Sequence, residues 1–160
     1  MTDRHHRTTG LTPGGQQAAA AAAAVPPGTP VRIIRELSRP EALGLLGSVP
    51  MGRVVFSHHA LPAIRPVNHI LADGHVIIRV HHGAALLGPA RYGAVVAYEV
   101  DELDPAERTG WSTVVTGFAS LVQDPEEQRR YRDLLQPWIG RETEHVVRIS
   151  TDIVTGYRLG

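Results

Sequence analysis

The stretch that decides the fold is residues 52–87, GRVVFSHHALPAIRPVNHILADGHVIIRVHHGAALL. Its three extended apolar runs are residues 53–57, 63–71 and 75–81. The pair Asp73-Gly74 separates the last two runs, and such a pair is typical of a two-residue β-hairpin turn with positive φ at both positions. Residues 84–92 then suit a short helix. This order predicts adjacent antiparallel strands with a helix after the last of them.

Capping motifs predict two further helices. Ser38-Arg39-Pro40-Glu41 has the spacing of a capping box with Pro in the first turn, which predicts a helix over 38–48 that ends near Pro50. Asp124-Pro125-Glu126-Glu127 combines an Asp cap, a Pro at the first helical position and a Glu three residues after the cap. This second motif predicts a helix that runs to about Gln136.

Four more apolar runs complete the expected sheet, at residues 94–103, 111–122, 145–150 and 153–159. Gly117 lies inside the second of these runs, where a missing side chain indicates a bulge or a sharp bend, as in a strand that curls around a barrel. Six or more antiparallel strands with a few helices at the edges describe a small β-barrel of the α+β class.

Length and composition bound the domain organisation. The chain has 160 residues, of which 42% are hydrophobic, and this is enough for one domain with a substantial core. Residues 1–30 are poor in large apolar side chains and rich in Ala, Gly, Pro, Thr and His, so a disordered tail is expected there. The folded domain is expected over residues 31–160.

The charged residues exclude several classes of function. Sixteen basic and sixteen acidic side chains cancel, so no overall field favours nucleic acid or an anionic membrane. The basic residues are all arginine, which rules out a lysine Schiff base, and a bound phosphate would need Arg, His or backbone N–H groups. The absence of cysteine excludes disulfides, thiolate metal sites and cysteine nucleophiles.

A membrane segment is not expected. No window approaches the about 20 uninterrupted apolar residues that a membrane helix needs. The alanine run Ala18–Ala24 is short and ends at Pro26-Pro27, so it fits neither a signal peptide nor an anchor. A cytoplasmic location is the expectation.

A series of short motifs carries a resemblance to a known family. The series is Gly52-Arg53-Val54-Val55, Arg65-Pro66-Val67-Asn68, Asp73-Gly74, Arg79 through Leu86, Glu99-Val100-Asp101, Gly110-Trp111-Ser112 and Gly117. In order and spacing it resembles the pyridoxamine 5'-phosphate oxidase-like family of flavin-nucleotide-binding split barrels, over about residues 33–159. The resemblance implies a six-stranded antiparallel split β-barrel with peripheral helices. It also implies a homodimer with two FMN sites at the subunit interface, each built by both subunits.

The resemblance also implies where the cofactor would lie. The implied site residues are Arg65, Pro66, Val67 and Asn68 beside the flavin ring, Arg79, Val80, His81, His82 and Ala85 around the phosphate, and Trp111 and Ser112 on a neighbouring strand. No side chain is assigned as the catalyst, because a bound flavin carries the redox chemistry. No metal is expected, since the histidines do not fall at tight ligand spacing on one predicted helix.

The chain departs from the family pattern after Gly83. Relatives place a hydroxyl and then one or two basic residues there, whereas this chain has Ala84, Ala85 and Leu86. Arg79, His81, His82 and Arg91 lie close in sequence and offer compensation. Three interpretations stay open: an FMN-dependent oxidoreductase acting on a small molecule, a non-catalytic dimeric binding module with a degenerate phosphate clamp, or a haem- or deazaflavin-binding relative. In a haem protein, the axial ligand would be one of His58, His69, His81 and His82.

Several candidates have a structural alternative. Arg65, which precedes Pro66, suits an edge facing a cleft or a surface ion pair. Trp111 could stack on a ring or pack in the core, and Asn68 could bind ring atoms or satisfy a structural partner. Glu99, Asp101 and Glu102 are interpreted as a solvated strand face rather than an acid pair.

Overall fold

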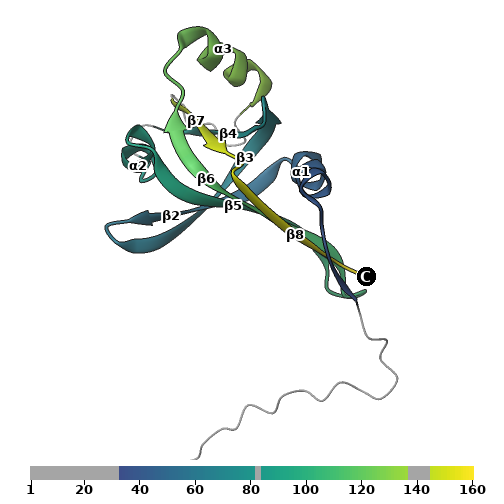
Figure 1. Ribbon diagram of the computed structural model, residues 1–160. Coiled ribbons are helices and arrows are strands. Elements are labelled where there is room, and N and C mark those ends of the chain that lie inside the picture. The colour runs from purple at the N-terminus through teal and green to yellow at the C-terminus, as the bar shows by residue number, and fades with distance from the viewer. Residues whose placement is uncertain (1–32, 82–83, 137–144) are drawn as a thin grey trace, which may run out of the picture. The chain divides into compact units, whose positions relative to one another are not determined.

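The computed structural model describes residues 33–81, 84–136 and 145–160 (Figure 1). The helices and strands in chain order are β1 (Ile34–Glu36), α1 (Arg39–Ser48), β2 (Met51–His58), β3 (Leu61–Ala72), β4 (His75–Val80), α2 (Leu87–Arg91), β5 (Ala94–Asp104), β6 (Thr109–Leu121), α3 (Pro125–Leu134), β7 (His145–Ser150) and β8 (Ile153–Leu159). The predicted tail, residues 1–30, lies outside the described ranges.

The strands form one antiparallel sheet that closes on itself. Its order is β1-β8-β6-β5-β2-β3-β4-β7, and a further pairing between β6 and β7 closes the six strands from β6 to β7 into a barrel. β8 and β1 extend the sheet beyond the barrel along β6 (Figure 1). The predicted α+β class and six-stranded antiparallel split barrel are confirmed.

Gly117 lies where β6 changes partners. β6 pairs with β8 as far as Thr116, opposite Ile153, and with β7 from Ala119, opposite Ile149. A Cβ atom at Gly117 would lie 1.9 Å from the carbonyl oxygen of Ser150, so only glycine permits this approach. Residues 117–118 of β6 therefore face residues 150–152, where β7 passes into β8. This two-to-three mismatch is the kind of bulge or bend that the sequence predicted.

The local motifs act as expected. At the start of α1, the Glu41 carboxylate accepts hydrogen bonds from the backbone N–H (2.8 Å) and the hydroxyl (2.7 Å) of Ser38. At the start of α3, the Asp124 carboxylate accepts from the backbone N–H of Glu127 at 2.8 Å. In the β3–β4 turn, Asp73 and Gly74 have φ values of 51° and 75°, as a two-residue hairpin turn requires.

Two elements differ from the prediction. β1 was not foreseen, because three exposed residues at a sheet edge carry no apolar alternation. The helix expected over 84–92 begins only at Leu87. Before it, Ala84 takes part in a turn, donating to the His81 carbonyl at 3.1 Å and accepting from the Leu87 N–H at 2.9 Å.

Buried apolar side chains form two clusters on opposite faces of β4. The interior cluster fills the barrel and includes Val76, Ile78 and Val80, together with residues of α1 and α2. The α3 cluster lies on the outside and joins Ile77 and Val146 to Tyr131 and Leu135. The buried members of the α3 cluster are Ile77, Val122, Tyr131, Leu135 and Val146. Strand alternation thus gives β4 two buried faces. None of the described helices is long and apolar enough to cross a membrane.

Candidate functional site

Among the described residues, the segment Arg65–Val67 of β3 has a strand neighbour on one edge only. β3 pairs with β2 from Leu61 to Asn68, but its pairing with β4 begins only at His69. Pro66, which has no N–H to donate, therefore lies where the strand can lack a second neighbour, as predicted. The Arg65 side chain is exposed and donates to the adjacent Ile64 carbonyl at 2.7 Å. The residues that the structure describes place no acidic partner on Arg65.

Asn68 and Arg79 both contact the C-terminal end of α3. The Asn68 side-chain amide donates to the Gln136 carbonyl at 2.8 Å. The Arg79 guanidinium donates to the carbonyls of Leu135 at 3.0 Å and Arg132 at 3.4 Å. Helix ends leave such carbonyls without intrahelical partners and carry partial negative charge. Both residues therefore hold the end of α3 against the barrel.

The charge on Arg79 is not lost by this burial. Burial and the nearby charge of Arg132 lower the pKa of Arg79. An arginine starts from so high a pKa that it stays protonated at any physiological pH. A cation is thus held at the negative end of a helix, on the outer face of β4.

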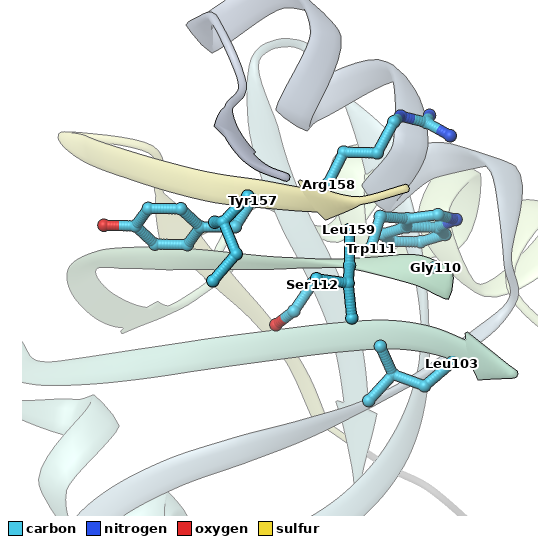
Figure 2. A pocket seen from close by; sticks show the side chains of 8 residues that line it. Leu103, Gly110, Trp111, Ser112, Tyr157, Arg158 and Leu159 are labelled. Atoms are coloured by element: carbon cyan, nitrogen blue, oxygen red, sulfur yellow. The ribbon is translucent and has the colours of Figure 1, made fainter. Parts of the chain in front are cut away.

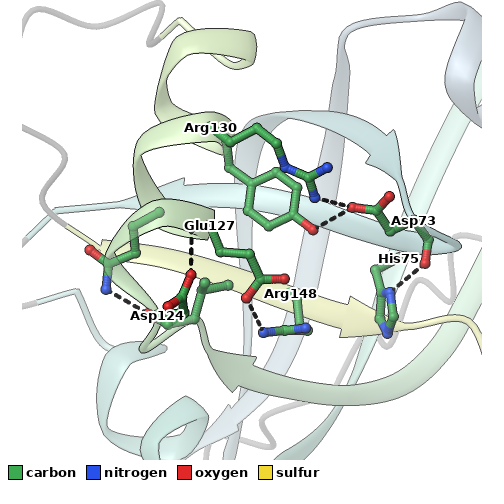
Figure 3. Close-up of polar contacts among 9 residues, drawn as sticks. Asp73, His75, Asp124, Glu127, Arg130 and Arg148 are labelled. Atoms are coloured by element: carbon green, nitrogen blue, oxygen red, sulfur yellow. Dashed lines mark hydrogen bonds and ion pairs between the residues drawn. The ribbon is translucent and has the colours of Figure 1, made fainter.

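The body of α3 is also fastened to the barrel, by ion pairs and a tyrosine hydrogen bond (Figure 3). Asp73, in the β3–β4 turn, accepts hydrogen bonds from Arg130 and from the Tyr131 hydroxyl, the latter at 2.8 Å. Both hydrogen bonds lower the pKa of Asp73, and the bond from Tyr131 has the larger effect. Arg148 of β7 lies 2.8 Å from the Glu127 carboxylate. Contacts at both ends therefore define where α3 sits.

His81 lies at the end of β4, at the corner where the resemblance places a phosphate. Its Nδ1 atom is buried and has no hydrogen-bond partner in the described part of the chain. An unpaired buried polar atom is costly, so it marks a place where a ligand group would be favourable. Val80, the preceding residue, points into the barrel and is 9% exposed. His82 lies outside the described residues.

The wall beside His81 is apolar. Ala84 and Ala85 are half-buried against the interior cluster, and Leu86 belongs to it with 3% of its surface exposed. The only nearby cation described on this segment is Arg91, which is exposed in the last turn of α2. A helix that began at Ala84 would offer backbone N–H groups to a phosphate, but α2 begins only at Leu87.

A groove lies at the far end of β6, between β5 and β8 (Figure 2). It has a volume of about 370 Å³ and is lined by Ile34, Leu103, Gly110, Trp111, Ser112, Tyr157, Arg158 and Leu159. Trp111 packs in the interior cluster and is 5% exposed, which agrees with the core alternative for this residue. Ser112 is half-buried and lies on the outer face, with its hydroxyl 3.5 Å from the Glu99 carboxylate.

The expected site residues thus fall into two groups. The first group, Asn68, Arg79 and His81, lies on β3 and at the end of β4, whereas Trp111 and Ser112 lie on β6. Around the barrel, two strands separate β6 from β3 in either direction, namely β5 and β2 or β7 and β4. One chain therefore does not bring the two groups together.

Two residues that sequence reasoning did not pair make a buried polar contact inside the barrel. The Tyr98 hydroxyl lies 2.8 Å from Nδ1 of His69 and 2.9 Å from the Val67 carbonyl. Nε2 of His69 lies 2.9 Å from the Leu46 carbonyl at the end of α1. The alternation of Val96, Tyr98 and Val100 could have indicated an inward tyrosine in need of a partner, but not which partner.

The acidic residues of β5 also have a different environment from the one expected. Glu99 and Asp101 are half-buried, and both bind Arg53 of β2, at 2.9 Å and 2.8 Å. Glu102 lies on the opposite face of the strand, opposite Trp111. Of the three, only Glu102 matches the expected solvated strand face. The pairing of Glu99 and Asp101 was not expected, because the sequence does not show that Arg53 lies beside β5.

The histidines do not assemble into a metal site within the described ranges. Groups of three or more His, Asp or Glu side chains that could hold a metal are absent there. His58 is exposed beside His59 at the β2–β3 turn, and His75 contacts the Asp73 carbonyl. His69 has both ring nitrogens engaged, so an axial haem bond would have to break an existing contact.

Comparison with known proteins agrees with this architecture. A family model described as pyridoxamine 5'-phosphate oxidase matches residues 38–158. The uncharacterized protein Rv0080 of Mycobacterium tuberculosis is 54% identical over 132 residues, which are 80% of this chain and 87% of the relative.

Two solved structures share the fold over most of their length. A proposed pyridoxamine 5'-phosphate oxidase of Corynebacterium glutamicum is 33% identical, with a TM-score of 0.66, and the match covers 79% of this chain and 98% of that one. The FAD binding protein of Mycobacterium smegmatis is 28% identical, with a TM-score of 0.59 and the same coverage of 79% and 98%. The chain therefore belongs to the pyridoxamine 5'-phosphate oxidase family.

Proposed function

We propose that this protein is a dimeric flavin-binding protein that oxidises or reduces a small molecule at a flavin held between two subunits. The observation that carries the proposal is the position of the two residue groups on β3–β4 and on β6, which lie apart within one chain. A site that uses both groups needs the first group from one chain and the second from another. The proposed cofactor is FMN.

A partly exposed row of residues, apolar except for Thr116, supports the association of two chains. The row runs across five strands, β3, β2, β5, β6 and β8, through Ile64, Val55, Ala97, Thr116 and Ile153, which are paired neighbours in the sheet. Its ends, Ile64 and Ile153, are 55% and 60% exposed, and the neighbouring pair Val95 and Phe118 is also exposed. A contiguous apolar surface of this kind is typical of a protein interface.

The corner at His81 fits one polar group of a cofactor. Its buried Nδ1 atom would meet a phosphate oxygen or a ring atom, and the exposed guanidinium of Arg91 would contribute charge. Arg79 and Asn68 would act less directly, because both already hold α3. A bound flavin supplies the transfer of hydride or electrons, and the protein binds and orients it. The FAD-binding relative supports a flavin as the ligand class.

A second function is favoured by a different observation. Ala84, Ala85 and Leu86 pack against the interior cluster and present no cation where relatives have basic residues. A protein that had lost this phosphate clamp could serve as a dimeric binding module without catalysis. Such a module would prefer a ligand with less phosphate, such as a deazaflavin or haem.

An absorption spectrum of the purified protein, followed by titration with FMN, FAD, riboflavin, a deazaflavin and haem, tests these functions. A ligand that binds only the native state raises the melting temperature. We expect FMN to bind in the micromolar range and more tightly than riboflavin, which lacks the phosphate. If riboflavin binds as tightly as FMN, the His81 corner does not hold a phosphate. If no flavin binds, the binding module is the better description.

The dimer is tested separately by light scattering. We expect wild-type protein to be dimeric and Ile153→Glu to be monomeric, because the substitution places a charge in the apolar row. Leu134→Glu is the matched control, since Leu134 has the same 60% exposure but lies on α3, outside the row. Equal behaviour of the two variants would contradict the interface.

A further inference from the structure

The contact between His69 and Tyr98 joins two elements through the barrel interior. Tyr98 is fully buried and His69 is 3% exposed. Together they connect the Leu46 carbonyl at the end of α1 with the Val67 carbonyl of β3, through distances of 2.8–2.9 Å. We call this set, Leu46 O, His69, Tyr98 and Val67 O, the interior relay.

The protons of the relay can be assigned from its chemistry. The Leu46 carbonyl can only accept, so Nε2 of His69 carries a proton and Nδ1 of the neutral ring is an acceptor. Burial lowers the pKa of His69 and raises that of Tyr98, so both groups are neutral near pH 7. The single Tyr98 O–H proton therefore has two acceptors within reach, Nδ1 of His69 and the Val67 carbonyl, and it is shared between them.

Gly52 makes room for the relay. It lies opposite Val67 in the β2–β3 pairing. A Cβ atom at this position would lie 2.6 Å from both the hydroxyl oxygen and Cε1 of Tyr98, and 2.7 Å from the Glu99 carbonyl. The missing side chain thus lets the Tyr98 hydroxyl reach the backbone of β3.

The relay ends directly behind residues 65–68 of β3, the segment that the family resemblance places beside the flavin ring. Val67 and Asn68 are neighbours on β3, and Val67 has no partner on β4. Because the described strands pair with this segment on one edge only, its position depends on β2 and on contacts from the interior. A small displacement of groups that hold a ligand is enough to weaken binding strongly.

We propose that Tyr98 and His69 are positioning residues for the ligand-binding segment of β3, a role that rests on the proposed flavin site. Neither side chain touches the cofactor in this role. They hold the Val67 carbonyl from inside the barrel, so that the outer atoms of residues 65–68 meet the ring in one arrangement.

The decisive variant is Tyr98→Phe, which removes only the hydroxyl group. Thr113→Val is the matched control, because Thr113 is also fully buried and its hydroxyl also donates to a backbone carbonyl, that of Thr155 at 3.2 Å. Thr113 lies on β6, away from β3. A second pair tests His69: His69→Gln keeps a donor and an acceptor, whereas His69→Leu keeps neither.

Two readouts separate positioning from general stability. The first is the exchange of the Val67, Asn68 and His69 amide protons, followed by NMR without any ligand. We expect exchange there to quicken at least fivefold in Tyr98→Phe and His69→Leu, and less than twofold in Thr113→Val and His69→Gln. Unchanged exchange in Tyr98→Phe, or equal acceleration in Thr113→Val, would overturn the proposal whether or not a flavin binds.

The second readout is the dissociation constant of FMN together with its visible absorption spectrum. We expect at least fivefold weaker binding and a shifted spectrum in Tyr98→Phe, but not in Thr113→Val. Wild-type FMN affinity and spectrum in Tyr98→Phe would overturn the link between the relay and the cofactor. A wild-type protein that binds no flavin would instead refute the proposed function, so the two failures can be told apart.

Discussion

The polar side chains on the two faces of β3 and β4 have different partners. Inside the barrel, the polar side chains of the relay are fully buried or nearly so, and they bind each other and backbone carbonyls. On the outer face, Arg79 and Asn68 contact the end of α3, and His81 keeps a buried nitrogen without a described partner. The polar groups of the inner face are thus paired with one another and with backbone carbonyls. The outer face keeps one buried nitrogen to which a ligand could bind. Alternate residues of the same strands provide both.

The strongest test of this comparison uses two adjacent residues with no exposed surface, Ile77 and Ile78. Ile78→Ala leaves a cavity in the interior cluster, and Ile77→Ala leaves one in the α3 cluster. Each should lower the free energy of unfolding by about 2–5 kcal/mol, measured with urea.

Hydrogen exchange distinguishes the two isoleucine variants. Ile78→Ala should increase exchange in all the barrel strands, while Ile77→Ala should increase it mainly in α3. The same exchange pattern in both would show that the two clusters form one cooperative unit, and the comparison would fail.

A smaller effect is expected at the contact between Arg79 and α3. Arg79→Met keeps the apolar stem but removes the hydrogen bonds to the Leu135 and Arg132 carbonyls. We expect a loss of about 1–2 kcal/mol in unfolding free energy, because a charged donor is lost from a helix end. Arg129→Met, at an exposed position of α3, is the control and should change the free energy of unfolding little. An equal effect of the two variants would remove the special role of Arg79.

The interior relay predicts a pH dependence. Burial lowers the pKa of His69 below its ordinary value of 6.5. As the pH falls, the unfolded chain therefore takes up a proton that the folded ring does not. The stabilisation from the neutral ring is present above pH 6.5, and the free energy of unfolding decreases as the pH drops below that value. Unfolding free energies at pH 7.5 and 5.5 measure this loss, which should be smaller in His69→Gln. An identical pH dependence in wild type and variant would contradict the buried neutral ring.

The smallest effect is expected at the exposed capping box of α1. Hydrogen bonds from the Ser38 hydroxyl and backbone N–H lower the pKa of Glu41 from 4.5 to about 2. The contribution of this carboxylate is therefore present above pH 4.5 and is lost as the pH falls toward 2. Melting temperatures of wild type and Glu41→Gln should differ at pH 6 and converge near pH 2. A constant difference over this range would show that the charge is not involved.

Much of the fold could be predicted because its signals are local. Asp73-Gly74, Ser38–Glu41 and Asp124–Glu127 act within a few residues of themselves, and each forms the turn or helix start that its chemistry favours. The resemblance of the motif series located the barrel and its family. β1 and the start of α2 were missed, because a short exposed edge strand and a turn of alanines have no distinctive local pattern.

The candidate site was less predictable, because its contacts join residues far apart in sequence. Nothing in the sequence near Arg79 or Asn68 indicates that the end of α3 would supply their partners. The pairing of Arg53 with Glu99 and Asp101 depends on β2 lying beside β5. His69 drew attention as a metal or haem ligand, whereas its ring is engaged by Tyr98 and the Leu46 carbonyl.

The sequence by itself determined the strand and helix order, the tight β3–β4 hairpin, the helix starts and the family, since alternation, capping and turn propensity act over a few residues. Only the tertiary structure decided which polar groups meet. It placed Tyr98 behind Val67, set the end of α3 on Arg79, and put Trp111 and Ser112 three strands from β3. It also left a nitrogen of His81 without a partner among the described residues. The physical reason is that closing the barrel sets the distances between strands, and hydrogen bonds form only over those distances.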